Sequence, residues 1–172
     1  MYRTSPMMCW SARSTQTCSS EQQPTVEIRR VTADDELSLR QFTCRVIGEP
    51  WTQLVEELIQ QNLAFSLGVG EVDAVGAWDD ESLVGVAAWR SEGPSRRRVA
   101  VLAVATGAKR RGIGRELKLE VLDRARRDGI ESVVSIVDWN NDAMLGLNYE
   151  IGARIVHVPN DPGYMLCVFD LR

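Results

Sequence analysis

The sequence predicts an α/β protein with one central, twisted mixed sheet of about six to seven strands and about four helices on its two faces. Short apolar or alternating segments occur between longer segments of helical periodicity along the whole chain. An almost uninterrupted apolar run, 99–105, is typical of a strand that is covered on both faces. A basic loop, two glycines and a long amphipathic segment follow that run directly.

Composition favours one ordinary domain. The chain has 172 residues, 44% hydrophobic and 26% charged, which is enough to bury a core. Its net charge is −4, yet basic residues dominate from 96 to 127, where the acids are only Glu116, Glu120 and Asp123. A basic band on an acidic protein indicates a local anionic ligand and argues against general nucleic-acid binding.

Cysteine and histidine usage predicts a cytoplasmic protein without a metal site. The four cysteines have neither metal-ligand spacing nor the density of a disulfide framework, and His157 is the single histidine. No stretch approaches the length of apolar sequence that a membrane span needs. Residues 1–24 are rich in Ser, Thr and Gln without periodicity. We expect them to be a disordered arm or a misassigned start, with a targeting peptide as the alternative, and the ordered domain to cover 25–172.

The first half of the domain reads as a strand, two helices and a hairpin. Residues 25–29 alternate as a strand, and Asp34, Asp35 and Glu36 suit the start of a helix that runs to about 46. Gly48-Glu49-Pro50 breaks that helix, and a second is predicted over 52–63. Strands are predicted over 72–78 and 83–90 around a polar turn, and over 99–105 after a solvated entry of three arginines.

The helix after the glycines is the best-specified element. Its apolar stripe consists of Ile113, Leu117, Val121, Leu122 and Ala125. We expect the i,i+4 pairs Glu120–Arg124 and Asp123–Arg127, and Gly129 as the residue that ends the helix. A buried strand over 132–137, a helix to 151 capped by Asn140 or Asn141, and two closing strands, 153–158 and 164–171, complete the domain.

The loop before that helix predicts a site for a phosphorylated ligand. Lys109, Arg110 and Arg111 supply cations, while Gly112 and Gly114 let main-chain N–H groups approach an anion. The helix start adds its dipole and its free donors. A helix start without a ligand would favour acidic residues over three cations.

Two stretches resemble the GNAT superfamily of acetyl-CoA-dependent N-acetyltransferases. Residues 102–104 followed by 109–114 are similar to the family's acyl-CoA signature, Arg/Gln-x-x-Gly-x-Gly/Ala after a strand. Asn141, Ala143, Leu147, Tyr149 and Gly152-Ala153 are similar to its Asn-x-Ala…Gly-Phe helix and turn. The likeness covers 26–172. Two residues in these stretches depart from the family pattern. Lys109 replaces the usual Arg or Gln. Asn148 occupies the position at which the family often has a tyrosine that acts as an acid, and Tyr149, one residue later, lies about 100° round the helix from that position.

The resemblance implies how acetyl-CoA would be held. Main-chain N–H groups of Arg110 to Arg115 would wrap the pyrophosphate, and main-chain groups of Leu102 and Val104 would pair with the pantetheine arm. Asn141 would hold the arm from the other side, between two strands that splay apart. The implied cofactor-binding residues are Leu102, Ala103, Val104, Lys109, Arg110, Arg111, Gly112, Ile113, Gly114, Arg115 and Asn141.

The resemblance also implies the catalytic groups. The N–H of Val104 would stabilise the oxyanion, and Tyr149 would assist the departing thiolate. Trp51 would contact the acceptor, because the break between the first two helices borders the acceptor groove in this family. For the base, the candidates are Asp138, Glu92 and a water relay that touches Glu71 or Asp73.

These features favour an N-acetyltransferase that acts on a primary amine of a small molecule or a protein. The alternative is a non-catalytic acyl-CoA-binding regulatory module, which the asparagine at position 148 keeps open. A third hypothesis, nucleic-acid binding by the arginine cluster, predicts affinity that falls steeply with salt. We expect no nucleic-acid or membrane partner, and a monomer or a homodimer.

Overall fold

Seven strands form one mixed sheet in the order β1-β2-β3-β4-β5-β7-β6 in the computed structural model, which describes residues 26–47 and 72–172. The strands are β1 (Glu27–Arg30), β2 (Val72–Asp79), β3 (Ser82–Ser91), β4 (Arg96–Val104), β5 (Ser132–Asp138), β6 (Arg154–Val158) and β7 (Asp161–Asp170). Three α-helices lie in the described residues, namely α1 (Glu36–Phe42), α3 (Ile113–Arg127) and α4 (Asp142–Glu150). The mixed α/β class and the number of strands are thus as predicted.

Several predictions fall outside the described residues. These are the arm over 1–24, the break over 48–50, the helix over 52–63, and the two side chains Trp51 and Glu71. None of the helices in the described residues combines the length and the apolar character needed to cross a membrane.

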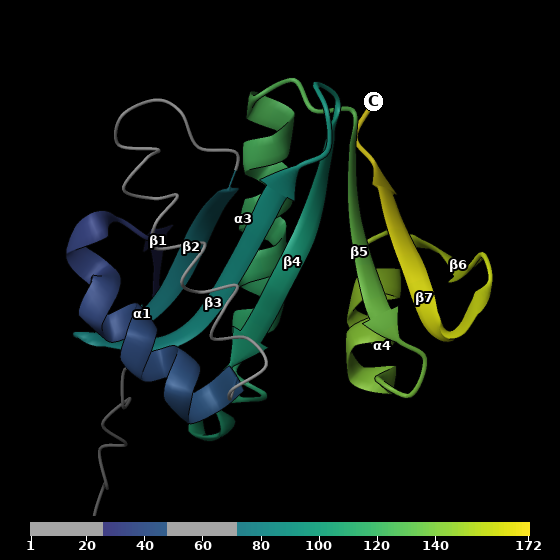
Figure 1. Cartoon of the computed structure of the whole chain (residues 1–172). Helices are drawn as coiled ribbons and strands as arrows, with labels where there is room; N and C mark the ends of the chain where they lie inside the picture. The colour runs from purple at the N-terminus through teal and green to yellow at the C-terminus, as the bar shows by residue number, and fades with distance from the viewer. Residues whose placement is uncertain (1–25, 48–71) are drawn as a thin grey trace, which may run out of the picture.

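Helix α1 covers one face of the β2–β4 part of the sheet, and α3 covers the other face (Figure 1). One of the acids predicted to favour the start of α1, Asp35, also connects the helix to β1. Asp35 is buried and accepts two bonds from the Arg29 guanidinium, at 2.8 and 2.7 Å, and one from the Thr32 N–H at 2.9 Å. The bond from Arg29 is the main reason that the pKa of Asp35 is lowered. The helix therefore starts from a point fixed to β1.

Helix α3 follows its predicted stripe, and every member of that stripe is buried. The Glu120–Arg124 pair is present at 2.7 Å. The predicted Asp123–Arg127 side-chain pair is wrong, because Asp123 instead pairs with Arg126 at 2.7 Å and Arg127 reaches back to Glu120 at 3.2 Å. Gly129 ends the helix with a left-handed φ of 69°, as expected of a glycine in this position.

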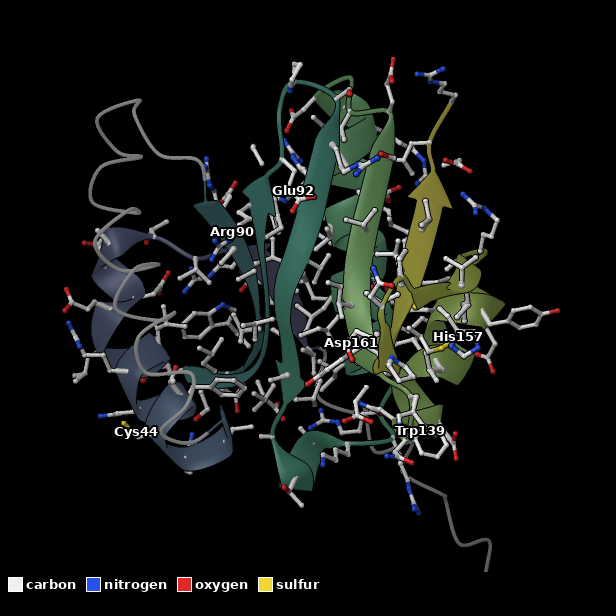
Figure 2. All side chains as sticks on the ribbon, turned by 45° about the vertical axis from the view of Figure 1, so that its right-hand side comes forward. Cys44, Arg90, Glu92, Trp139, His157 and Asp161 are labelled. Atoms are coloured by element: carbon white, nitrogen blue, oxygen red, sulfur yellow. The ribbon has the colours of Figure 1, made fainter. Side chains whose placement is uncertain are left out.

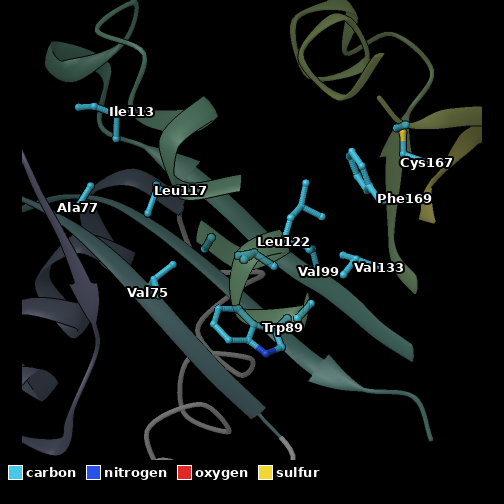
Figure 3. Close-up of a cluster of buried hydrophobic side chains, with 14 of the residues drawn as sticks. Val75, Ala77, Trp89, Val99, Ile113, Leu117, Leu122, Val133, Cys167 and Phe169 are labelled. Atoms are coloured by element: carbon cyan, nitrogen blue, oxygen red, sulfur yellow. The ribbon is translucent and has the colours of Figure 1, made fainter. Parts of the chain in front are cut away.

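The larger core lies between the sheet and α3. It includes Val75 of β2, Trp89 of β3, Val99 of β4, Leu117 of α3 and Phe169 of β7, whose side chains Figure 3 shows. A second core on the opposite face packs α1 against the β2–β4 part of the sheet and includes Val101. Because Val99 and Val101 are both buried, but in different cores, β4 is covered on both faces as its apolar run predicts.

Strand β4 begins three residues before the predicted strand and includes the arginines interpreted as its solvated entry. Arg97 is paired within the sheet with Ser91 and Val133, and its guanidinium contacts Asp128 at 2.5 Å. Its side chain is only 12% exposed. The arginine is therefore part of the structure that joins β4 to the end of α3.

The pairing of β4 with β5 is parallel and short. It covers only four positions, from Arg96↔Ser132 to Val99↔Ser135, although both strands continue beyond that point. Figure 1 shows the two strands diverging toward α4. Strand β7 pairs with β5 along its whole length, from Ser132↔Asp170 to Asp138↔Tyr164, so β5 leaves β4 and stays with β7. The predicted splay between these strands is therefore present in the fold.

Candidate functional site

The loop between β4 and α3 presents main-chain donors at the point where the sheet opens. Gly112 has a left-handed φ of 80°, which a residue with a side chain rarely adopts, and Arg110 has a φ of 64°. The carbonyl of Gly112 accepts the N–H groups of Arg115 and Glu116 at 2.9 and 3.1 Å. Within the described residues the N–H groups of Gly112, Ile113 and Gly114 have no hydrogen-bond acceptor. Three free donors at a helix N-terminus form a site for an anion.

The edge of β4 that faces β5 presents further main-chain donors. The Ala105 N–H donates to the Val84 carbonyl of β3 at 2.8 Å. Since N–H directions alternate along an antiparallel strand, the N–H groups of Leu102 and Val104 point away from β3 and toward the opening. In the described part of the chain, no strand pairs with this stretch of the β5-facing edge. The edge can therefore receive an extended ligand that carries amide groups.

A cavity of about 700 Å³ joins these two sets of donors. Helix α4 supplies its opposite wall through Ala143, Met144 and Leu147. A second cavity of about 320 Å³ adjoins it where β4 and β5 part, and the two share Leu102, Ala103, Asn141, Met144 and Val46. Ten of the eleven predicted cofactor-binding residues line the larger cavity: Leu102, Ala103, Val104, Lys109, Arg110, Gly112, Ile113, Gly114, Arg115 and Asn141.

Arg111 is the one member of the predicted set that does not line this cavity. Its guanidinium donates to Asp79 at 2.6 Å, so its side chain is directed to the end of β2. Lys109, Arg110 and Arg115 are exposed at the rim, and Glu150 is the one acid among the described residues that line the cavity. The mouth of the cavity is therefore positively charged, which suits an anionic ligand.

Asn141 and Asp138 lie on the far side of the opening, between β5 and α4. The Asn141 Oδ1 accepts the Met144 N–H at 3.1 Å, which makes Asn141 the N-cap of α4 and settles the choice left open between Asn140 and Asn141. Asp138 lines the smaller cavity, and its Oδ1 accepts the Asn140 N–H at 2.8 Å. Glu92 lines neither cavity, and Figure 2 places it at the opposite end of the sheet from Trp139, the neighbour of Asp138.

The structure does not bring Tyr149 to the cavities. Its side chain is 74% exposed on α4, and it lines neither of them. Asn148, one position earlier, is fully buried and points to β7, where its Nδ2 donates to the Cys167 Sγ at 3.5 Å. The rotation of about 100° per residue thus places Asn148 on the buried side of α4 and Tyr149 on its exposed side.

Sequence reasoning missed Lys118, which lines the smaller cavity from α3 and is 1% exposed. A signal for it was present, because Lys118 precedes Val121 by three residues and Leu122 by four. That spacing places its side chain beside the apolar stripe and therefore against the sheet. A lysine on the buried face of a helix is rare unless it is paired.

The fold and the site together define a class of protein. A mixed sheet opens between two parallel strands, an anion-binding loop lies at the mouth, and an unpaired strand edge leads inward. Such an arrangement can receive an elongated, anionic ligand that carries amide groups.

The chain belongs to the acetyltransferase (GNAT) family, whose model matches residues 35–149. No curated protein matches the sequence. Among solved structures, the PaiA N-acetyltransferase of Thermoplasma acidophilum in complex with coenzyme A is 17% identical. The match covers 85% of this chain and 99% of that one, with a TM-score of 0.72.

Two further structures have the same fold. YncA, a putative acetyltransferase of Salmonella typhimurium with acetyl-CoA, is 18% identical and covers 86% of this chain and 95% of its own, with a TM-score of 0.65. The ribosomal-protein-S18-alanine N-acetyltransferase of Escherichia coli is 15% identical and covers 84% and 91%, with a TM-score of 0.63. Identities this low establish a shared fold, and the GNAT family match makes this chain an acetyltransferase by family.

Proposed function

We propose that the protein transfers an acetyl group from acetyl-CoA to a primary amine of a small molecule or a protein. The observation that carries the proposal is that two sets of free main-chain donors, one at the start of α3 and one on the open edge of β4, line one cavity. Relatives of this fold that contain coenzyme A or acetyl-CoA support it.

The diphosphate would bind at the start of α3. The free N–H groups of Gly112, Ile113 and Gly114 would donate to its oxygens, and the helix dipole would stabilise the negative charge. Lys109, Arg110 and Arg115 would add cationic side chains at the rim, and Arg111 would contribute its main chain.

The pantetheine arm would extend the sheet into the opening. Its amides would pair with the outward main-chain groups of Leu102 and Val104, as an added strand does at a sheet edge. Ala103 would line the same path, and Asn141 would close it from the α4 side. This arrangement leads the thioester inward, toward the end of the opening where β4 and β5 begin to pair.

The reaction is attack of a neutral amine on the thioester carbonyl. The N–H of Val104 would donate to the oxyanion, and one such donor is typically worth about 3 kcal/mol of barrier. Asp138 lines the smaller, inner cavity and would accept, directly or through water, the proton that the acceptor's ammonium group must lose before the neutral amine attacks. Trp51 would contact the acceptor, and the acidic residues outside the basic band favour a cationic acceptor.

Replacement of Tyr149 by Phe is expected to leave the rate of acetyl transfer unchanged, within about twofold. The phenol is 74% exposed and lines neither cavity, so it has no route to the leaving sulfur. Steady-state kinetics with saturating acetyl-CoA measures the effect. A loss of about tenfold or more in kcat would instead support Tyr149 as the acid.

The proposed function is tested by calorimetric binding of coenzyme A and by release of free thiol from acetyl-CoA. The acceptor panel consists of polyamines, aminoglycosides, amino acids and peptides with free N-termini. We expect tight binding of the coenzyme and turnover with at least one cationic amine. Binding without turnover on any amine would support the regulatory module, which the buried Asn148 favours. Absence of binding would contradict both, and salt-sensitive retention on DNA would favour a nucleic-acid partner.

A further inference from the structure

Lys118 is a charged side chain in the core of the protein. It is 1% exposed, and its Nζ donates to the Ser135 Oγ at 3.2 Å and lies 5.1 Å from the centroid of the Phe169 ring. In the part of the chain that the structure describes, no carboxylate pairs with it. A buried, unpaired ammonium is costly, so its presence needs a reason beyond packing.

The lysine belongs to a polar cluster that spans the β5–β7 half of the sheet. Ser135 lies opposite Cys167 in the β5–β7 pairing, and Asn148 of α4 donates to the Cys167 Sγ at 3.5 Å. The Oδ1 of Asn148 is buried, and no partner for it lies among the described residues. The cluster therefore joins α3 to α4, and the position at which the family often has a tyrosine acid forms part of it.

The cluster borders the closed end of the opening in the sheet. Lys118 and Ser135 line the inner cavity of about 320 Å³ together with Val99, and the β4–β5 pairing ends at Val99↔Ser135. That cavity continues into the larger one along Leu102 and Ala103. A ligand that enters from the α3 loop with its diphosphate therefore directs its far end toward Lys118.

We propose that Lys118 is the acid that protonates the departing coenzyme A sulfur, an inference that rests on the proposed function. The amine nitrogen bonds to the carbonyl carbon, the C–S bond breaks with its electron pair on sulfur, and an Nζ proton of Lys118 forms the thiol. The nitrogen releases its own proton to Asp138 or to water and from there to solvent, and solvent returns a proton to the neutral lysine. The products are one amide and one thiol, with the enzyme unchanged.

The chemistry of the site matches this role. Burial lowers the pKa of Lys118 to about 8, close to the value of roughly 8.5 for an ordinary thiol. An acid with a pKa near that of its leaving group, and near the working pH, is an efficient proton donor. Lys118 therefore carries its proton at neutral pH and gives it up easily.

Among the groups that surround Lys118, the lysine itself is the best-placed proton donor. Cys167 of β7 approaches it, but burial raises the pKa of that thiol and keeps it neutral. Strand β5 presents the Ser135 hydroxyl and Asp138, β4 presents valines, and α4 presents the Asn148 amide. Among the described residues that line the inner cavity, Lys118 and Asp138 are the only titratable ones, and Asp138 is placed to accept a proton.

The first test compares wild type with Lys118→Met and Lys118→Arg in the acetyl-transfer assay. Methionine removes the charge at similar length, and arginine keeps the charge but cannot release a proton. We expect the wild-type kcat to fall above about pH 8, and both variants to lose about tenfold to a hundredfold in kcat and to lack that fall. The Kd of coenzyme A is expected to stay within about twofold, because the diphosphate contacts are distant. An unchanged kcat and pH profile in Lys118→Met would overturn the proposal.

A second test needs no acceptor. The ultraviolet absorbance of the thiolate is followed against pH for bound coenzyme A, with bound desulfo-coenzyme A as the blank that removes the protein's own thiols. A cation at the sulfur is expected to lower the pKa of the bound thiol by about one unit or more in wild type, and not in Lys118→Met. A bound thiol that titrates like free coenzyme A would overturn the proposal even where no amine is turned over. Absence of coenzyme A binding would overturn the proposed function itself.

A preference for succinyl-CoA over acetyl-CoA is the remaining outcome. Suppose that wild type prefers succinyl-CoA, and that Lys118→Met loses this preference but keeps the fall of kcat above about pH 8. Lys118 would then be assigned to recognition of an acidic acyl chain, and its role as the acid would be overturned.

Discussion

Gly114→Glu is expected to weaken the binding of coenzyme A by about a hundredfold or more, a loss of about 3 kcal/mol, while the protein stays folded. A Cβ at this position would lie 3.7 Å from Leu102 Cδ2, 3.8 Å from Val104 Cγ2 and 3.9 Å from Leu147 Cδ2. These are ordinary contacts, so the helix tolerates the side chain. The rest of the glutamate would occupy the cavity between β4 and α4, and its carboxylate would repel the diphosphate. Isothermal calorimetry measures the affinity, and circular dichroism confirms the fold.

Gly146→Glu is the matched control for this prediction. Gly146 also lies within a helix, α4, but beyond its own helix no atom of the described residues lies within 4 Å of its Cβ position, and it lines neither cavity. The control therefore introduces the same charge and the same gain in helix propensity without entering the cavity. Equal affinity of the two variants for coenzyme A would contradict the assignment of this cavity to the ligand.

Lys118→Met is expected to raise the free energy of unfolding by about 3 kcal/mol at neutral pH, even though it removes a polar contact. The pKa of Lys118 falls from 10.5 to about 8 on folding, and each unit of such a shift is worth about 1.4 kcal/mol. Below pH 8 wild type bears the full cost of the buried ammonium. From pH 8 to 10.5 the folded lysine loses its proton while the unfolded one keeps it, so wild-type stability rises relative to the variant.

The difference between the two proteins is measured by urea unfolding at intervals from neutral pH to pH 10.5. Titration of the other groups cancels in this difference, so the advantage of Lys118→Met is expected to shrink by about 3 kcal/mol over the range. Lys109→Met, which removes a lysine already exposed to water, is the control and is expected to show no such trend. A difference that stays constant with pH would contradict a buried, protonated Lys118.

Together the two Lys118 predictions describe a residue that costs stability and serves activity. A variant that is more stable and less active is the usual signature of a functional site, because selection retains a destabilising group only where it acts. If the lysine served packing alone, Lys118→Met would change the free energy of unfolding, but kcat of the variant would still fall above about pH 8 as in wild type.

The anion-binding loop and helix α3 could be predicted because their signals are local. Gly112 and Gly114 lie within the first residues of the helix that they serve, and the stripe from Ile113 to Ala125 repeats at helical spacing. Such patterns depend on neighbours within one or two turns, so the sequence carries them directly. The same applies to Gly129 at the end of α3 and to Asn141 at the start of α4.

Predictions that depended on side-chain choice among several neighbours were less successful. Asp123 and Arg127 have the favourable spacing, yet Arg127 pairs with Glu120 and Asp123 with Arg126, because competing partners lie at similar distances on one exposed face. Exposed pairs differ by only a few tenths of a kcal/mol, so their spacing does not decide among them.

The sequence by itself determined the α/β class, the basic loop before α3 and the family to which the likeness points, since each is carried by residues close together in the chain. Only the tertiary structure decided that β7 takes the place beside β5, that β4 and β5 part after Val99, and that Lys118 lies at the end of the opening. These facts depend on contacts between residues far apart in sequence. Strand pairing and burial depend on which elements pack against each other in the folded protein, and the sequence of one segment does not specify its neighbours.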